Sequence, residues 1–257
     1  MLTFQHGAYN FGVIALATAS FALIFAGGMA INDYFDYESD ITVHPERPIP
    51  SNQISPEGAL QFSIVVFLAG EAVALVINLL ASMIAAFWII FLILYPVFFK
   101  RISGLLSNIV IGLVEGTMPL FGEAAIFQTI SITSLSFAGL SLVIVGGNIL
   151  KDVVSVEGDV KAGYANLAAT WGISTVTRVG AFVCFIAIVA LTIPYFVGVV
   201  SVAYLIPIVL AGLIVSYSGI SLFRQPDVQN VERRLKQFYM SIIMYPIALV
   251  LGTFLLR

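Results

Sequence analysis

The stretch YNFGVIALATASFALIFAGGMAI at residues 9–31, which runs directly into NDYFDYESD at residues 32–40, decides the fold of this chain. An α-helix needs about 20 apolar residues to cross the hydrocarbon core of a bilayer. Residues 9–31 supply that length without a charged side chain. No basic segment precedes the run and no small-residue cleavage site follows it, so we expect a retained membrane helix rather than a cleaved signal peptide.

The composition of the whole chain also indicates a membrane protein. Of its 257 residues, 60% are hydrophobic and only 10% are charged, and the mean hydropathy is +1.05. A soluble globular domain carries roughly 25% charged residues, so a water-soluble fold is excluded. The net charge is −3, and we expect no nucleic-acid partner. The single cysteine, Cys184, cannot form a disulfide within the chain.

Apolar runs of membrane-spanning length recur along the chain and predict an all-α, polytopic transmembrane bundle of about eight helices in a single domain, 1–257. The expected spans are 9–31, 58–81, 83–99, 104–126, 131–150, 175–197, 199–223 and 237–256. The boundary at Ala81-Ser82 rests only on the apolar length, which is too great for one span. Three polar connections separate the spans, at 32–57, 151–174 and 224–236.

The positive charges indicate how the bundle is oriented. Because each span reverses the side of the membrane, the three polar connections and the short connection after residue 99 fall on one side. That side collects ten of the eleven Lys and Arg residues, namely Arg47, Lys100, Arg101, Lys151, Lys161, Arg178, Arg224, Arg233, Arg234 and Lys236. Only Arg257 falls on the other side. The positive-inside rule therefore predicts a cell-membrane protein whose polar motifs face the cytoplasm.

The first acidic motif follows the first span. Asn32, Asp36 and Asp40 are spaced i, i+4 and i+8, which places their oxygens on one helical face. Such a row of like charges repels itself unless a hard divalent cation is shared, and Mg²⁺ suits carboxylates combined with water and phosphate. The alternative is a solvated acidic loop, which is common. Acids beside an apolar helix end are costly unless they are used, which favours the metal site.

A second motif ends the fifth span. Its residues Asn148, Asp152, Ser155 and Asp159 again share one helical face, whereas Glu157 points elsewhere. Two oxygen-rich faces on one membrane side can hold Mg²⁺ ions with a diphosphate between them. The metal-ligand candidates are Asn32, Asp36, Asp40, Asp152 and Asp159, and the four aspartates are the catalytic candidates.

Several cations lie beside these motifs. Arg47 belongs to a loop that three prolines stiffen, so its guanidinium could clamp a phosphate. The diphosphate-binding candidates are Arg47, Lys100, Arg101, Lys151 and Lys161. For each cation alone, anchoring under the positive-inside rule is an equally good explanation. The cations of 224–236 are assigned to anchoring or to anionic lipid.

A polar and small stripe runs inward along the fourth span, through Asn108, Gly112, Glu115 and Pro119. An intramembrane glutamate is expected to face the interior of a bundle. The substrate-cavity candidates are therefore Asn108, Glu115, Asn148 and Ser155. Glu115 and the similarly placed Glu71 could instead be neutral, hydrogen-bonded structural residues.

From residue 30 to residue 171 the sequence resembles the UbiA superfamily of intramembrane prenyltransferases. NDYFDYESD with the HPERPIPS that follows at 44–51 looks like the family's first motif and its Arg-Pro loop. YPVFFKR at 95–101 resembles its lysine-bearing stretch, and KDVVSVEGDVKAGYANLAATWG at 151–172 resembles its second motif. The resemblance implies an all-α fold around a laterally open cavity, Mg²⁺ as cofactor, and transfer of a prenyl group from its diphosphate to a lipid or aromatic acceptor.

The sequence departs from the family pattern at two places. The family usually has nine helices, and the run at 9–31 resembles its second, so the chain either is truncated or builds one wall of the cavity differently. Ser155 stands where the second motif commonly carries an Asp, which implies a weakly held second metal or a larger part for Asp152.

Within the family, the motifs look most like those of archaeal digeranylgeranylglyceryl phosphate synthases, which alkylate a glycerol hydroxyl in ether-lipid synthesis. Members with an aromatic acceptor, 4-hydroxybenzoate or a naphthoate, share the metal motifs and are the first alternative. A divalent-cation transporter is the second alternative. Its ligands would be expected near mid-span at broken helices, whereas these lie at helix ends.

Overall fold

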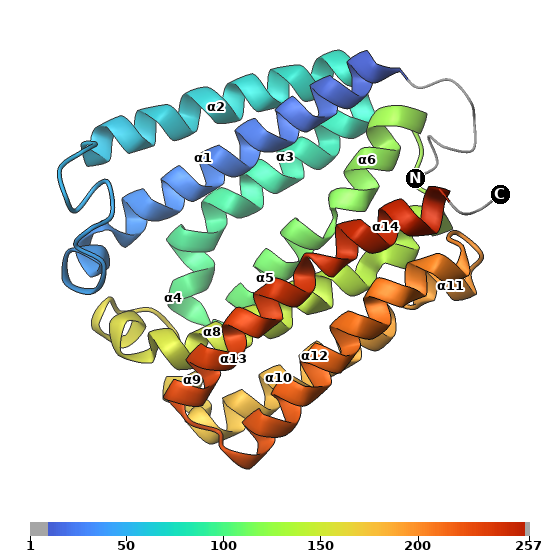
Figure 1. The fold of residues 1–257 in the computed structure, drawn as a ribbon. Coiled ribbons are helices and arrows are strands. Elements are labelled where there is room, and N and C mark those ends of the chain that lie inside the picture. The colour runs from blue at the N-terminus through green and yellow to red at the C-terminus, as the bar shows by residue number, and fades with distance from the viewer. Residues whose placement is uncertain (1–9, 255–257) are drawn as a thin grey trace.

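The computed structural model describes residues 10–254, which form a bundle of helices joined by short connections (Figure 1). In chain order its helical elements are α1 Phe11–Val43, α2 Pro56–Ile77, α3 Leu79–Leu94, η2 Tyr95–Phe99, α4 Lys100–Ile102, α5 Gly104–Gly116, α6 Met118–Phe127, α7 Ile132–Leu135, η3 Ser136–Ala138, α8 Gly139–Lys161, α9 Leu167–Trp171, α10 Ile173–Ala190, α11 Ile193–Phe196, η4 Val202–Tyr204, α12 Leu205–Arg224, α13 Val228–Ile242 and α14 Met244–Phe254. The predicted all-α class is confirmed.

Eight helical segments within residues 10–254 are long and apolar enough to cross a membrane, as the sequence predicts. Large apolar side chains cover much of the outside of the bundle; Leu68, Val76 and Phe196, for example, are exposed. An apolar outside is stable in lipid, where each helix satisfies its own backbone hydrogen bonds. The chain is a multi-pass membrane protein.

Trp88 on α3 forms the centre of the core in the first half of the chain. Its side chain is fully buried, and its ring centroid lies 5.4 Å from that of Phe25 and 4.8 Å from that of Phe121. Its indole N–H donates to the hydroxyl of Thr117 at 2.7 Å, so the one polar atom of the ring is satisfied. This packing joins α1 and α3 to the start of α6.

Glycines let the helices around α8 approach closely. A Cβ at Gly116 on α5 would collide with the Ser141 side chain of α8, and a Cβ at Gly146 on α8 would lie 2.6 Å from the Cys184 sulfur of α10. Small residues at helix crossings are the usual means of close packing in membranes. They hold α8, which carries the second motif, against both α5 and α10.

The segments that carry the polar motifs gather at one end of the bundle. Figure 1 shows the α1–α2 connection, α4, the C-terminal end of α8 with α9, and the α12–α13 connection at this end, and α11 at the opposite end. The predicted gathering of cations follows from this arrangement. Arg257, the cation expected at the other end, lies outside the described residues.

Two predicted boundaries are wrong. The break between the second and third spans lies at Asn78 rather than at Ala81-Ser82, because Asn78 is extended and its side-chain oxygen caps α3 by accepting from the Ala81 N–H at 2.8 Å. Its amide group also donates to the Ala124 carbonyl at 2.9 Å, which fixes the break against α6. The predicted span at 104–126 is confirmed by the membrane-spanning segment Gly104–Phe127, within which α5 gives way to α6 at Thr117, with Pro119 in the first turn of α6.

The second wrong boundary is that of the connection predicted at 224–236. Only residues 225–227 are non-helical there, and α13 begins at Val228 with the Asp227 carboxylate accepting from the Asn230 N–H at 2.9 Å. The two acidic motifs are likewise helical, since α1 continues to Val43 and α8 to Lys161. The motifs are therefore solvent-side extensions of membrane helices, and their side-chain phases are fixed.

Gly116→Ala should destabilise the protein by about 1–3 kcal/mol, because the added methyl group would lie 2.6 Å from the Ser141 Cα and would push α5 away from α8. Thermal unfolding of the detergent-solubilised protein measures this as a lower Tm. Gly219→Ala on α12 is the matched control, since its methyl group meets no atom within 4 Å. Equal Tm values for the two variants would contradict the tight α5–α8 crossing.

Candidate active site

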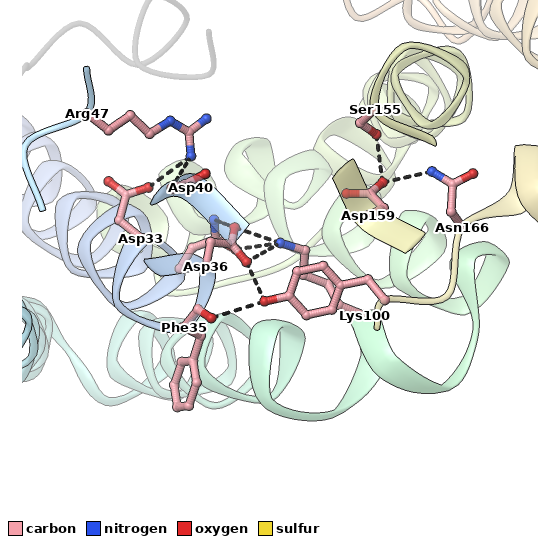
Figure 2. A network of polar contacts seen from close by, with 11 residues as sticks. Asp33, Phe35, Asp36, Asp40, Arg47, Lys100, Ser155, Asp159 and Asn166 are labelled. Atoms are coloured by element: carbon pink, nitrogen blue, oxygen red, sulfur yellow. Dashed lines mark hydrogen bonds and ion pairs between the residues drawn. The ribbon is translucent and has the colours of Figure 1, made fainter. Parts of the chain in front are cut away.

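The carboxylate of Asp36, near the C-terminal end of α1, is the most densely hydrogen-bonded group at the motif end. The Lys100 ammonium lies 2.8 Å from both of its oxygens. The Asn32 amide group and the Tyr164 hydroxyl each donate to it at 2.7 Å. Figure 2 shows this network, with donors converging on Asp36 from separate parts of the chain. Asp36 is thereby held buried in one orientation.

A short π-helix directly precedes Lys100 and sets its position. Residues Tyr95–Phe99 adopt this wider helical turn, which is uncommon and is often found at functional sites. It places the Lys100 ammonium 4.5 Å from the centroid of the Tyr164 ring and 5.7 Å from that of Tyr95. One carboxylate and two aromatic faces thus stabilise a largely buried cation.

Arg47 forms an ion pair with Asp40, a second carboxylate of the first motif. Its guanidinium donates to Asp40 at 2.7 Å and lies 3.7 Å from Asp33. The backbone after α1 folds back through turns, in which the Arg47 N–H donates to the His44 carbonyl at 3.0 Å. These turns bring the Arg47 guanidinium back to the acidic face of α1.

The second motif has neutral partners instead. Asp159 accepts from the Ser155 hydroxyl at 2.6 Å and from the Asn166 amide at 2.7 Å. Asp152 accepts from the Asn108 amide at 3.0 Å and from a backbone N–H at 3.2 Å. Within residues 10–254, neither carboxylate forms an ion pair, whereas Asp36 and Asp40 of the first motif are each paired with a cation.

The connection after α8 joins the two motifs. Tyr164 reaches Asp36, the next residue donates its N–H to the Lys100 carbonyl at 2.8 Å, and Asn166 donates to Asp159. Gly163, with φ of +74°, supplies the left-handed turn that begins this path. Side chains that lie far apart in sequence are thereby fixed to one another.

Tyr164 lies outside the membrane spans, and its phenol is a donor at neutral pH. Burial, followed by the charge and the hydrogen bond of Asp36, raises the pKa of the Tyr164 hydroxyl above its ordinary value. The hydroxyl therefore keeps its proton and can hold Asp36 in a single orientation.

Three residues of the site, Tyr164, Asn166 and Tyr95, were not predicted from the sequence. Asn166 could have been found as a helix N-cap, since its oxygen accepts from two N–H groups of α9. Tyr95 is close enough to interact electrostatically with Asp36, Asp152, Asp159 and Glu115. Its phenol thus lies between the two motifs, a position that no local pattern reveals.

The four substrate-cavity candidates divide into two pairs. Glu115 and Asn148 line one cavity of roughly 130 Å³. Asn108 donates a hydrogen bond to Asp152, and Ser155 donates one to Asp159. These two candidates therefore belong with the second motif.

The remaining cation candidates lie at the surface. Arg101, Lys151 and Lys161 are exposed, and none forms an ion pair with another described residue. Lys151 is close enough to interact electrostatically with Asp152 and Glu115, and Arg101 with Tyr164. Lys161 shows no such contact within residues 10–254. Only Lys100 and Arg47 are thus placed directly on the acidic side chains.

The oxygen donors of the motifs fit a hard divalent cation. Carboxylate and amide oxygens are the ligands that Mg²⁺ prefers. Within residues 10–254, no three acidic, histidine or cysteine side chains are close enough together to hold a metal by themselves. This fits an ion that takes one or two carboxylates and completes its shell with water and substrate phosphate.

The sequence has close relatives among characterised proteins. The digeranylgeranylglyceryl phosphate synthase of Haloquadratum walsbyi is 34% identical over 235 residues, which cover 88% of this chain and 80% of that protein. The digeranylgeranylglyceryl phosphate synthase of Methanopyrus kandleri is 39% identical over 194 residues, which cover 74% of this chain and 70% of that protein.

Solved structures share the fold. One that concerns digeranylgeranylglyceryl phosphate synthase in membranes matches with a TM-score of 0.77 and 27% identity, over 95% of this chain and 87% of that chain. The apo structure of a UbiA homolog from Aeropyrum pernix K1 matches with a TM-score of 0.78 and 16% identity, over 96% and 92% of the two chains, and this match supports the fold alone. The model of the UbiA prenyltransferase family matches residues 1–243. The chain therefore belongs to the UbiA prenyltransferase family.

Proposed function

We propose that this chain transfers a geranylgeranyl group from its diphosphate to the free hydroxyl of geranylgeranylglyceryl phosphate, with Mg²⁺ as cofactor, at the cytoplasmic side of the cell membrane. The observation that carries the proposal is the junction of two acidic motifs through Tyr164 and Asn166 at the polar end of an apolar bundle. The similarity to digeranylgeranylglyceryl phosphate synthases supports the choice of substrates.

The chain's own residues bind the diphosphate directly, through cationic side chains, and indirectly, through the magnesium that they would hold. Lys100 and Arg47 bring positive charge to the site, and each is oriented by a carboxylate of the first motif. The residues that would hold magnesium are Asn32, Asp36, Asp40, Asp152 and Asp159. Bound Mg²⁺ supplies the charge that neutralises a leaving diphosphate. No cation forms an ion pair with Asp152 or Asp159 within residues 10–254. A bound cation therefore stabilises the second motif more than the first, whose carboxylates are already paired.

The reaction joins carbon to oxygen inside the bundle. The allylic C–O bond breaks, and its electron pair leaves with the diphosphate. The acceptor oxygen then forms the new ether bond and loses its proton. Apolar helix faces exclude the water that would otherwise capture the electron-poor carbon. Aromatic faces such as that of Tyr95 can stabilise positive charge nearby.

The direct test offers the purified protein geranylgeranyl diphosphate together with a panel of acceptors, and identifies products by mass spectrometry. Geranylgeranylglyceryl phosphate should yield the doubly alkylated ether with release of diphosphate. The panel includes 4-hydroxybenzoate and a dihydroxynaphthoate. Prenylation of an aromatic acceptor alone would contradict the proposed acceptor but not the prenyltransferase activity.

Asp36→Ala, Asp40→Ala and Asp159→Ala should each lower turnover on the order of 100-fold or more, because each removes charge that is fixed where the leaving group develops. Glu157→Ala is the matched control on α8, since Glu157 is exposed and lies off the shared face. Initial rates with geranylgeranyl diphosphate measure the effect. Equal losses for Asp159→Ala and Glu157→Ala would contradict the assigned helical phase.

Ser155→Asp tests the second metal position. Ser155 lies 2.6 Å from Asp159, so a carboxylate there adds an oxygen ligand to the same face. If the cation is held loosely, the added charge should lower the Mg²⁺ concentration needed for half-maximal rate. Titration of the wild-type and variant rates with Mg²⁺ measures this. A higher requirement would mean that the extra acid only adds repulsion and that Ser155 is not a weakened ligand position.

Tyr164→Phe should lower stability by about 0.5–1.5 kcal/mol, because it removes the donor to Asp36 but keeps the ring beside Lys100. The native pKa of Tyr164 is raised, so its contribution is fully present below the ordinary tyrosine pKa of about 10 and is lost as pH rises through the higher native value. Thermal unfolding of both proteins across alkaline pH measures the difference. A difference that does not shrink above about pH 10 would contradict this role.

A further inference from the structure

Three glutamates, Glu71, Glu115 and Glu123, lie in the apolar part of the spans that the structure describes, and Glu115 is the one of these three without a hydrogen-bond partner. Glu71 accepts from the Ser82 hydroxyl at 2.5 Å, and Glu123 accepts from the hydroxyls of Ser131 and Ser134. Glu115 forms no hydrogen bond or ion pair with any other residue of the described chain, although it lies within a membrane-spanning segment. An ionisable side chain is costly in that setting unless it has a function.

The Glu115 side chain lies in the wall of a cavity. It lines the space of roughly 130 Å³ together with Asn148, Cys184 and Tyr239, while the rest of the wall is largely apolar. Tyr239 is 48% exposed, so the cavity is bounded on one side by a residue at the surface of the bundle. A single carboxylate thus faces a mostly apolar space beside the surface of the bundle.

This cavity lies directly below the second motif. Asn148 precedes Asp152 by one helical turn, which is about 6 Å along α8. Glu115 follows Asn108, the partner of Asp152, by two turns, or about 10 Å along α5. Helical side chains lean toward the N-terminal end of their helix. Because α5 begins at the motif end and α8 ends there, the Glu115 carboxylate leans toward the motifs while Asp152 leans toward the cavity.

The electrostatic contacts agree with this placement. Glu115 interacts electrostatically with Lys151, at the start of the second motif, and with Tyr95. The Tyr95 phenol also interacts electrostatically with Asp36 and Asp152. The carboxylate is therefore near the space where a diphosphate held by the motifs would present its allylic carbon. It contacts none of the proposed metal ligands.

We propose that Glu115 accepts the proton of the acceptor hydroxyl during ether formation, an inference that rests on the proposed function. The allylic C–O bond breaks and its electron pair goes to the diphosphate. The acceptor oxygen uses a lone pair to bond the carbon, and its O–H proton passes to a Glu115 oxygen. The carboxylic acid loses this proton to water after the products leave. The released diphosphate is the competing proton acceptor.

The pH dependence follows from the groups that face Glu115. They are Lys151 on α8, Tyr95 on η2 and Tyr239 on α13, and Cys184 of α10 lines the same cavity. The ordinary pKa of each of these groups lies above about 8. A fall in transfer at acidic pH therefore reports Glu115 or the motif aspartates. The aspartates also act on diphosphate release without acceptor, so the two contributions can be separated.

The experiment compares two reactions of Glu115→Gln. The first is ether formation with geranylgeranylglyceryl phosphate, which should fall by roughly 10²–10⁴-fold, the usual contribution of a general base. The second is the slow hydrolysis of geranylgeranyl diphosphate without acceptor, which should keep the wild-type rate. Glu115→Asp should recover part of the transfer rate together with its acidic pH limb. Glu71→Gln is the matched control and should leave both reactions unchanged.

Two results would overturn the inference. Transfer at the wild-type rate in Glu115→Gln would assign the proton to diphosphate. Equal loss of transfer and hydrolysis would mean that Glu115 supports the fold or the diphosphate instead. Failure of the proposed function is a separate result, because it appears in the wild type as absence of the ether product. In that case the same ratio of transfer to hydrolysis is measured with whichever panel acceptor the wild type uses.

Discussion

The contact on which the rest of the site depends is the ion pair between Asp36 and Lys100. Taking either charge out of water alone would be costly, and the pair is stable because both carboxylate oxygens lie 2.8 Å from one ammonium. Tyr164 then adds its hydroxyl to the carboxylate and its ring to the ammonium. One contact thereby fixes α1, the π-helical turn and the connection after α8 to one another.

The two motifs differ in how their charge is balanced, and the difference suits the proposed site, which has to bind a diphosphate and later release it. Asp36 and Asp40 are neutralised by Lys100 and Arg47, so the first motif is stable without other ions. The second motif has only neutral donors in the part of the chain that the structure describes. Charge brought by a cation is therefore most stabilising there, beside the cavity that Glu115 lines.

Much of this was predictable because a bilayer imposes simple constraints on sequence. Span length and hydropathy predicted the eight membrane helices and the single polar end, and both are confirmed. The motif spacing predicted shared helical faces, and the resemblance to UbiA prenyltransferases is confirmed by the family match over residues 1–243. Family membership makes the chain an enzyme and so removes the transporter alternative. The roles of the individual site residues stay predictions.

The sequence by itself determined the elements and the chemistry available at their ends, since hydropathy and helical phase are local properties of the chain. The tertiary structure alone decided the partners. Asp36 and Tyr164 meet across 128 residues, and no pattern within one helix records such a contact. The break at Asn78 is likewise fixed by α6 rather than by apolar length. Glu115 faces a cavity instead of a partner because five helices, α5, α8, α10, α12 and α13, converge there, and that convergence exists only in the folded bundle.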